Sequence, residues 1–301
     1  RSSRPIVNLR SDLQEILKGY LQKPQYLITY LIPDFFGHPT TRNNFSDMNG
    51  TYYEWALFIG TIPILLLPLI LLSSSRSKKL SLIFIIIAAA AGSFSFDLPH
   101  ARWVFDAHVP VLSTGIANRI LFVPAFFLSL LAGLALNGWL STDDKKRRRF
   151  TLITITGNLM IFAAIWIFLW KLSPQATYDP LRFPSTWYLV SRRNAVIPTF
   201  IFFVGITSLL TGALNKKLLT VTAISLVVAT IGQNLYQFHK FTPFSQSQFV
   251  YPPHPALTFL QNHAGVNRFL GYNGVFLNYN FATQYKIYSI EGYDYLNDLK
   301  R

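Results

Sequence analysis

Residues 120–142 read ILFVPAFFLSLLAGLALNGWLST, a run of 23 positions without a charged side chain. A helix rises 1.5 Å per residue, so this run is long enough to cross the roughly 30 Å hydrocarbon core of a bilayer. The composition of the whole chain agrees, because 51% of its 301 residues are hydrophobic and only 13% are charged. Soluble domains are about one quarter charged. The sequence therefore predicts an integral membrane protein.

Similar charge-free runs recur along the chain. The six runs are 55–75, 80–96, 120–142, 150–170, 194–215 and 218–238. A membrane-spanning helix needs about 20 residues, and only the second run, with 17, is shorter. The prolines within these runs predict kinks rather than helix ends, because bilayer helices tolerate proline; they are Pro63, Pro68, Pro124 and Pro198. We expect an all-α polytopic membrane protein with six transmembrane helices.

Basic residues are concentrated in three short connections between the runs. The loops 76–79, 143–149 and 216–217 carry ten of the 27 Lys and Arg residues. The positive-inside rule places these loops in the cytoplasm and both chain ends outside the cell membrane. Anionic inner-leaflet lipid then accounts for the net charge of +14. We expect membrane lipids as partners, and no nucleic acid.

The segments on either side of the spans differ from them in character. Residues 1–54 form an extracytoplasmic segment in which Leu13–Ile32 reads as an amphipathic stretch lying on the membrane surface. The transmembrane domain covers 55–238. The extracytoplasmic tail, 239–301, begins with a short helix from Pro252-Pro253 to His263. Alternation from Tyr285 to Ile290 predicts a strand, so the tail is expected to open a small α/β segment.

Ionisable side chains lie at the expected outer ends of the spans rather than within them. The absence of charges inside the spans argues against an ion-coupled transporter. The residues at the outer ends are Glu54, Asp97, Arg119, Arg192 and Arg193. They fit two interpretations: snorkelling anchors, or a shared pocket in which Arg119, Arg192 and Arg193 bind a lipid-linked phosphate.

Other chemistry has little support in the sequence. The chain has no Cys and lacks the phosphate-binding loop, the dinucleotide fingerprint, the zinc-protease pair and the nucleophile elbow. We identify no cofactor. The acids and histidines between Asp97 and His108 have the chemistry to bind a divalent metal, but their spacing matches no standard site, and a solvated loop is favoured.

Several strings resemble a known family. They are LIPDFFG at 31–37, YEWALFIGTIPILL at 53–66, NRILFVPAFFLSLLAGLAL at 118–136, PALTFLQ at 255–261 and EGYD at 291–294. The first three resemble the central part of the bacterial YfhO membrane-protein family. The last two resemble the start of that family's extracytoplasmic segment.

The resemblance implies a glycosyltransferase of GT-C type. Such enzymes take a sugar from a polyprenyl-phosphate donor and transfer it outside the cytoplasm to a cell-envelope glycopolymer or lipid acceptor. Their catalytic base is an acid in the first outer loop, which the resemblance places before Arg1. The catalytic residue is therefore unknown, and we expect these 301 residues alone to transfer no sugar. Asp34, Glu54 and Asp97 are candidates for acceptor or loop contacts. The other classes left open are a transporter or flippase for a lipid-linked glycan, and a non-catalytic membrane scaffold.

Overall fold

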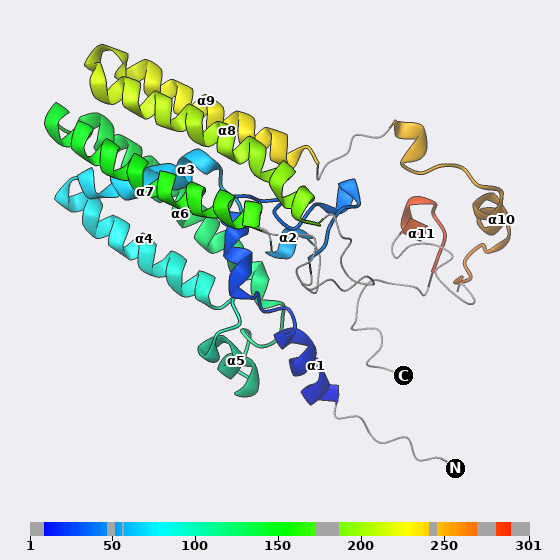
Figure 1. The fold of residues 1–301 in the computed structure, drawn as a ribbon. Helices are drawn as coiled ribbons and strands as arrows, with labels where there is room; N and C mark the ends of the chain where they lie inside the picture. Colours follow the sequence, from blue (N-terminus) through cyan, green and yellow to red (C-terminus); the bar gives the residue numbers. More distant parts are fainter. Residues whose placement is uncertain are drawn as a thin grey trace. The chain divides into compact units, whose positions relative to one another are not determined.

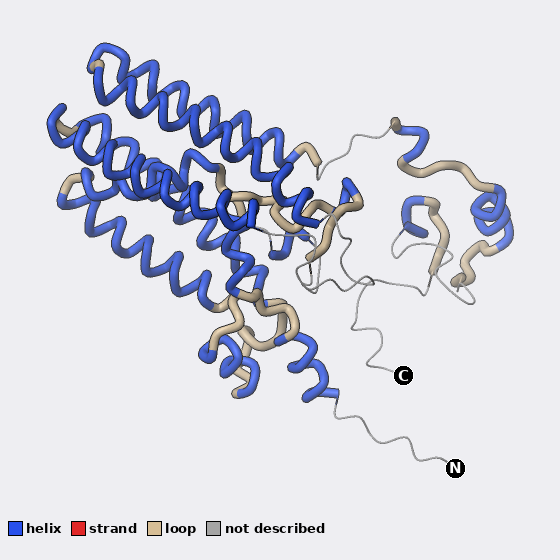
Figure 2. The backbone as a smooth tube through the Cα atoms, in the orientation of Figure 1, coloured by secondary structure: helices blue, strands red, loops and turns tan. Residues whose placement is uncertain are grey.

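A computed structural model describes residues 9–46, 52–55, 57–171, 187–240, 246–269 and 281–289. The chain divides into two compact units, 1–241 and 242–301, and each is described by itself. Within the described residues both units consist of helices and loops, and neither contains a strand (Figure 2).

The first unit is a bundle of helices that lie side by side (Figure 1). Its elements are α1 (Leu9–Lys18), η1 (Pro24–Tyr30), η2 (Pro39–Thr41), α2 (Tyr52–Trp55), α3 (Thr61–Leu66), η3 (Leu67–Leu72), α4 (Ser75–Ser93), α5 (Pro99–Asp106), η4 (Ala117–Leu121), α6 (Phe122–Ser141), α7 (Asp144–Lys171), α8 (Trp187–Leu214), η5 (Lys216–Leu218) and α9 (Leu219–Phe238). Four of the predicted spans are confirmed as helices long and apolar enough to cross a membrane. They are Ala117–Ser141, Asp144–Lys171, Trp187–Leu214 and Lys216–Phe238. The protein therefore has the character of a multi-pass helical membrane protein.

The core of the bundle lies between α3, α6, α7, α8 and α9. The Phe162 and Phe202 rings stack at 4.1 Å between α7 and α8. Both are buried, as are Leu65 and Trp139. A Cβ on Gly205 of α8 would lie 2.7 Å from a Leu65 methyl group, so a side chain there has no room. This close approach brings the short α3 into the centre of the bundle.

The first predicted span is wrong as a continuous helix. Its described residues form the end of α2, a non-helical stretch 57–60, and the short helices α3 and η3. Gly60 has a φ of +108°, a conformation that a residue with a side chain adopts at a cost. In hydrocarbon, an interrupted backbone needs other partners, and α9 supplies them. Gln233 accepts a hydrogen bond from the Thr61 amide at 2.8 Å, and Asn234 donates to the Ile59 carbonyl at 3.3 Å.

The second predicted span begins earlier than the sequence indicates. It forms α4, which includes Arg76, Lys78 and Lys79 in its first turns and packs along α6. Because α4 has 19 residues, its apolar part is shorter than a full span. Among the four prolines, Pro198 lies well inside a long helix, α8. Pro63 and Pro124 fall near the starts of α3 and α6, where a missing amide proton costs little.

The three basic connections meet at one end of the bundle, here called the basic end (Figure 1). The Ser73 hydroxyl, before α4, donates to the Leu134 carbonyl of α6 at 3.3 Å. Arg148 of α7 donates to the Ala213 carbonyl at the end of α8 at 3.1 Å. The clustering that the sequence predicts for these loops is thus present. The opposite end, where α4 ends and α8 begins, contains a cavity that is described below and is here called the cavity end.

The amphipathic stretch Leu13–Ile32 is not one helix. Instead, α1 ends at Lys18 and η1 begins at Pro24, with a turn at Gly19–Tyr20 between them. The turn brings the chain to the cavity end of α4, where the backbone amide of Gln22 donates to the Ser95 carbonyl at 2.7 Å. The buried Leu17 and Leu21 pack against Ala101 and Phe105 of α5.

The second unit contains η6 (Ser247–Phe249), α10 (Pro255–His263) and α11 (Phe281–Gln284). The predicted short helix ending at His263 is confirmed as α10. The predicted strand Tyr285–Ile290 is wrong in its described part, because the chain turns after α11. Lys286 has a φ of +55° and its amide donates to the Thr283 carbonyl, which closes the helix. A single bridge between Phe269 and Ser289 replaces the strand, and Ile290 lies outside the described residues.

Candidate functional site

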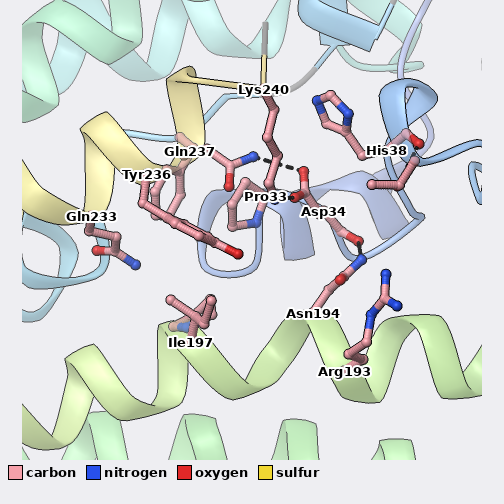
Figure 3. Close-up of a pocket in the computed structure, with 13 residues that line it drawn as sticks. Pro33, Asp34, His38, Arg193, Asn194, Ile197, Gln233, Tyr236, Gln237 and Lys240 are labelled. Carbon is pink, nitrogen blue, oxygen red and sulfur yellow. Dashed lines mark hydrogen bonds and ion pairs between the residues drawn. The ribbon is translucent and has the colours of Figure 1, made fainter. Parts of the chain in front are cut away.

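A polar cavity of about 240 Å³ opens at the cavity end of the bundle. Four parts of the chain line it: the loop 33–41, Phe58 before α3, the beginning of α8, and the last turns of α9 with Lys240 (Figure 3). The lining residues are Pro33, Asp34, His38, Thr41, Phe58, Arg193, Asn194, Ile197, Pro198, Gln233, Tyr236, Gln237 and Lys240. We call this space the polar cavity.

A glycine with positive φ and short-range hydrogen bonds fix the conformation of the loop 33–41. Gly37 has a φ of +81°, and a Cβ there would lie 2.1 Å from the Asn43 carbonyl oxygen, so only glycine fits. The Asn43 side chain accepts from the His38 amide at 2.9 Å, and His38 Nδ1 accepts from the Thr40 amide at 3.1 Å. These bonds place Asp34 and His38 at the cavity.

Asp34 is the centre of a buried hydrogen-bond network. Its carboxylate accepts from the Tyr52 hydroxyl, from Gln237 Nε2 at 2.8 Å and from Lys240 Nζ at 2.5 Å. Its carbonyl oxygen accepts from Asn194 Nδ2 at 2.6 Å. The Asp34 side chain is 5% exposed and that of Lys240 18%. The network therefore ties the loop to both α8 and α9.

The cavity carries a positive balance of charge. Arg193, Lys240 and Asp34 give one net positive charge. Lys240 is engaged by Asp34, whereas the guanidinium of the exposed Arg193 makes no hydrogen bond or ion pair with the residues that the structure describes. An anionic group entering the cavity would find the Arg193 guanidinium available for a bidentate contact.

Burial changes the acid–base behaviour of two residues beside Asp34. Burial lowers the pKa of His38, and Lys240 lowers it further, against an opposing effect of Asp34. His38 is thus neutral at pH 7, and because Nδ1 accepts from Thr40, its proton is on Nε2. Burial, together with the Asp34 carboxylate, raises the pKa of Tyr52. Tyr52 therefore remains a hydrogen-bond donor to Asp34.

The three arginines proposed from the sequence do not share one cavity. Arg193 lines the polar cavity. Arg192 caps α7 by donating to the Leu169 carbonyl at 2.9 Å, and its guanidinium lies 4.5 Å from the Trp170 ring. Arg119 is paired with Glu54 at 3.0 Å.

The acidic candidates are separated in the same way. Asp34 lies in the polar cavity, and Glu54 is held by Arg119. Asp97 is paired with Arg102, whose guanidinium holds the pKa of the Asp97 carboxyl below its usual range. No group of three or more His, Asp or Glu side chains that would bind a metal occurs in the described part of the chain.

Sequence reasoning missed most of the residues that complete the cavity. They are His38, Asn194, Gln233, Tyr236, Gln237 and Lys240. A signal was present, because Gln233, Gln237 and Lys240 are spaced four and three residues apart and so share one helix face. Two amides followed by a lysine on one face of an otherwise apolar helix indicate a polar partner.

Comparison with protein-family models, curated proteins and solved structures yields no match to this chain. The function is therefore inferred from the residues of the polar cavity.

Proposed function

We propose that the protein is the membrane part of a GT-C type glycosyltransferase in the bacterial cell membrane. It transfers a sugar from a polyprenyl-phosphate donor to a cell-envelope acceptor outside the cytoplasm. The polar cavity is the observation that supports this proposal. It lies at the end of an apolar helix bundle and combines an available arginine with amides and an aromatic ring.

The side chains of the cavity match the chemistry of a phosphate-linked sugar. Arg193 offers the geometry that holds phosphate by two parallel hydrogen bonds. The Asn194 side-chain oxygen is suited to a sugar hydroxyl, and Tyr236 offers a ring face, whereas Gln233 is already bonded to Thr61. In the transfer, the bond between the sugar C1 and the phosphate oxygen breaks, and the acceptor oxygen bonds to C1. The lipid phosphate leaves with the electron pair, and a base takes the acceptor proton.

Asp34 fits a positioning role in this scheme better than that of the base. Its carboxylate already accepts hydrogen bonds from Tyr52, Gln237 and Lys240. A base needs a free lone pair facing the acceptor hydroxyl. Asp34 instead holds Lys240 and the loop beside the phosphate site.

Arg193 supplies the first test of this function. We expect Arg193→Ala to weaken binding of a fluorescent polyprenyl-phosphate analogue by about ten- to a hundredfold. A hydrogen bond to a charged group contributes roughly 1.5 to 3 kcal/mol, and each 1.4 kcal/mol is a factor of ten. Arg193→Lys should bind with intermediate affinity, because an ammonium cannot form the bidentate contact.

Two further variants control that titration. Arg76→Ala removes an equal charge at the basic end and should bind like the parent. Arg119→Ala should also bind like the parent, because Arg119 is paired with Glu54 and does not line the cavity. Weakening by Arg119→Ala together with unchanged binding by Arg193→Ala would contradict the proposed site. A transporter or flippase is the alternative class, and it requires movement of the labelled lipid to the other leaflet.

Orientation follows from the clustering of basic residues and is a second expectation. The chain has no Cys, so single cysteines can be introduced cleanly. We expect an impermeant thiol reagent to label Thr114→Cys in intact cells, and Lys146→Cys only after permeabilisation. Both positions are exposed, one near α5 and one at the basic end. The reverse pattern would place the polar cavity in the cytoplasm.

A further inference from the structure

A second and larger cavity lies on another side of the bundle. It has a volume of about 620 Å³ and is lined by η1, the non-helical stretch 57–60, α3, η3, α4, α6 and α7. We call it the apolar groove. The lining includes three small residues of α4, which are Ala88, Ala89 and Gly92. At Gly92, α4 passes close to Pro124 of α6.

The groove opens toward the surroundings of the apolar helices. Leu27, Ile85 and Ile161 line it and are each about half exposed. Ile161 belongs to a helix that is long and apolar enough to cross a membrane, so hydrocarbon is the medium at this opening. An apolar groove open to hydrocarbon favours a hydrocarbon chain over water.

The depth of the groove corresponds to one leaflet. It extends from Pro24 and Leu98 at the cavity end to Asn158 of α7. Asn158 is 11 residues before Leu169, whose carbonyl is capped at the cavity end. At 1.5 Å per residue this is about 16 Å, half of a hydrocarbon core of roughly 30 Å. Asn158 donates to the Thr154 carbonyl at 2.9 Å and places a polar amide at the inner limit.

The non-helical stretch 57–60 separates the apolar groove from the polar cavity. Its successive side chains line different spaces. Leu57 and Ile59 line the groove, whereas Phe58 lines the polar cavity. A chain in the groove is therefore on the other side of this wall from the phosphate site.

Basic side chains lie beside the mouth of the groove. Lys23 comes directly before Pro24, which lines the groove, and Arg102 is paired with Asp97, the residue before the lining residue Leu98. Both are exposed. They fit the phosphodiester of a lipid headgroup at the membrane surface.

We propose that the apolar groove is a binding site for one acyl chain of a glycerophospholipid from the leaflet at the cavity end. Its headgroup lies near Lys23 and Arg102, and the chain ends near Asn158. This lipid is a resident partner of the fold and is distinct from any donor held in the polar cavity. Its binding does not depend on the proposed glycosyl transfer.

Photo-crosslinking of the full chain in nanodiscs tests the site. The probe is a phosphatidylglycerol with a diazirine in the middle of one acyl chain, and the labelled peptides are mapped by mass spectrometry. We expect the label to concentrate on peptides that contain Ile85–Ser93 and Asn158–Ile161. A label spread evenly over lipid-facing positions such as Phe200 and Val228 would overturn the proposal.

Two neighbouring alanines of α4 provide a matched pair of variants. Ala89 and Ala90 are both exposed, but Ala89 lines the groove and Ala90 does not. We expect Ala89→Phe to lower labelling of the groove peptides about tenfold, equivalent to 1.4 kcal/mol, because the ring occupies the space of the chain. Ala90→Phe should label like the parent. Equal labelling of both variants would overturn the proposal, and mapping of the parent remains decisive if Ala89→Phe does not fold.

Competition distinguishes the acyl chain from an isoprenoid chain. An equimolar amount of unlabelled polyprenyl phosphate should leave the labelling of the groove unchanged. Its displacement of the phospholipid would overturn the assignment and make the groove an isoprenoid site. If Arg193→Ala binds polyprenyl phosphate like the parent, the proposed site in the polar cavity fails while the lipid site in the groove stands. The two proposals therefore fail separately.

Discussion

Replacement of Asp34 by Ala is expected to lower the free energy of unfolding by about 3 to 5 kcal/mol, the range for removing one partner of a buried ion pair. The substitution leaves Lys240 Nζ, the Tyr52 hydroxyl and Gln237 Nε2 without their shared acceptor. Because the network joins the loop 33–41 to α9, its loss should also weaken binding in the polar cavity. Unfolding by SDS in mixed micelles measures the change.

Controls separate the loss of the ion pair from a general effect of removing a carboxylate. Asp97→Ala removes an acid from an exposed pair, Asp97 with Arg102, and should cost at most about 1 kcal/mol. The double variant Asp34→Ala with Lys240→Met should recover part of the stability, because it removes the unpaired ammonium. If Asp34→Ala unfolds like Asp97→Ala, the network does not stabilise the fold.

The long apolar helices could be predicted from the sequence because length and charge alone define them. Four runs appear as helices, and their ends agree with the predicted bounds, although α7 and α8 begin six and seven residues before the charge-free runs do. The interruption of the first run could not be predicted, because it depends on contacts with α9, which is far away in the sequence. Gln233 and Asn234 bond to Thr61 and Ile59 about 170 residues away, and no local pattern shows that pairing.

The candidate site could be predicted only in part, and for a similar reason. Arg193 and Asp34 were both proposed, but they were assigned to different roles. Their meeting depends on how the loop 33–41 lies against α8, as the bond from Asn194 to the Asp34 carbonyl shows. Arg119 and Arg192 looked equivalent to Arg193 in sequence. They differ from Arg193 because Arg119 is paired with Glu54, and Arg192 donates to a carbonyl at the end of α7.

The basic run 145–149 shows the same limit of composition. The sequence assigns all five charges to topology, yet two of them donate to backbone carbonyls at helix ends. Arg148 donates to the Ala213 carbonyl, and Arg147 is only 2% exposed. Part of this basic run therefore caps helices, so its residues do not all report on topology.

Replacement of Arg147 by Ala is the second change with a large expected effect. The guanidinium donates to the carbonyls of Trp139 at 3.1 Å, Leu140 at 3.3 Å and Thr142 at 2.6 Å, which are the last acceptors of α6. It also pairs with Asp144 at 2.5 Å. Hydrogen bonds to a charged group contribute about 1.5 to 3 kcal/mol each, and a cation favours a helix C-terminus. Because such bonds are not additive, we expect a total loss of about 3 to 4 kcal/mol in the free energy of unfolding.

Comparison with its neighbour makes the Arg147 prediction specific. Lys146→Ala removes the same charge one residue away, where the side chain is 69% exposed and pairs with Asp143. That variant should lose less than about 1 kcal/mol. Arg147→Lys should lie between the two, because an ammonium keeps the charge but cannot reach three carbonyls in the plane of a guanidinium. If Arg147→Ala and Lys146→Ala unfold alike in mixed micelles, capping does not stabilise α6 and the basic run acts through topology alone.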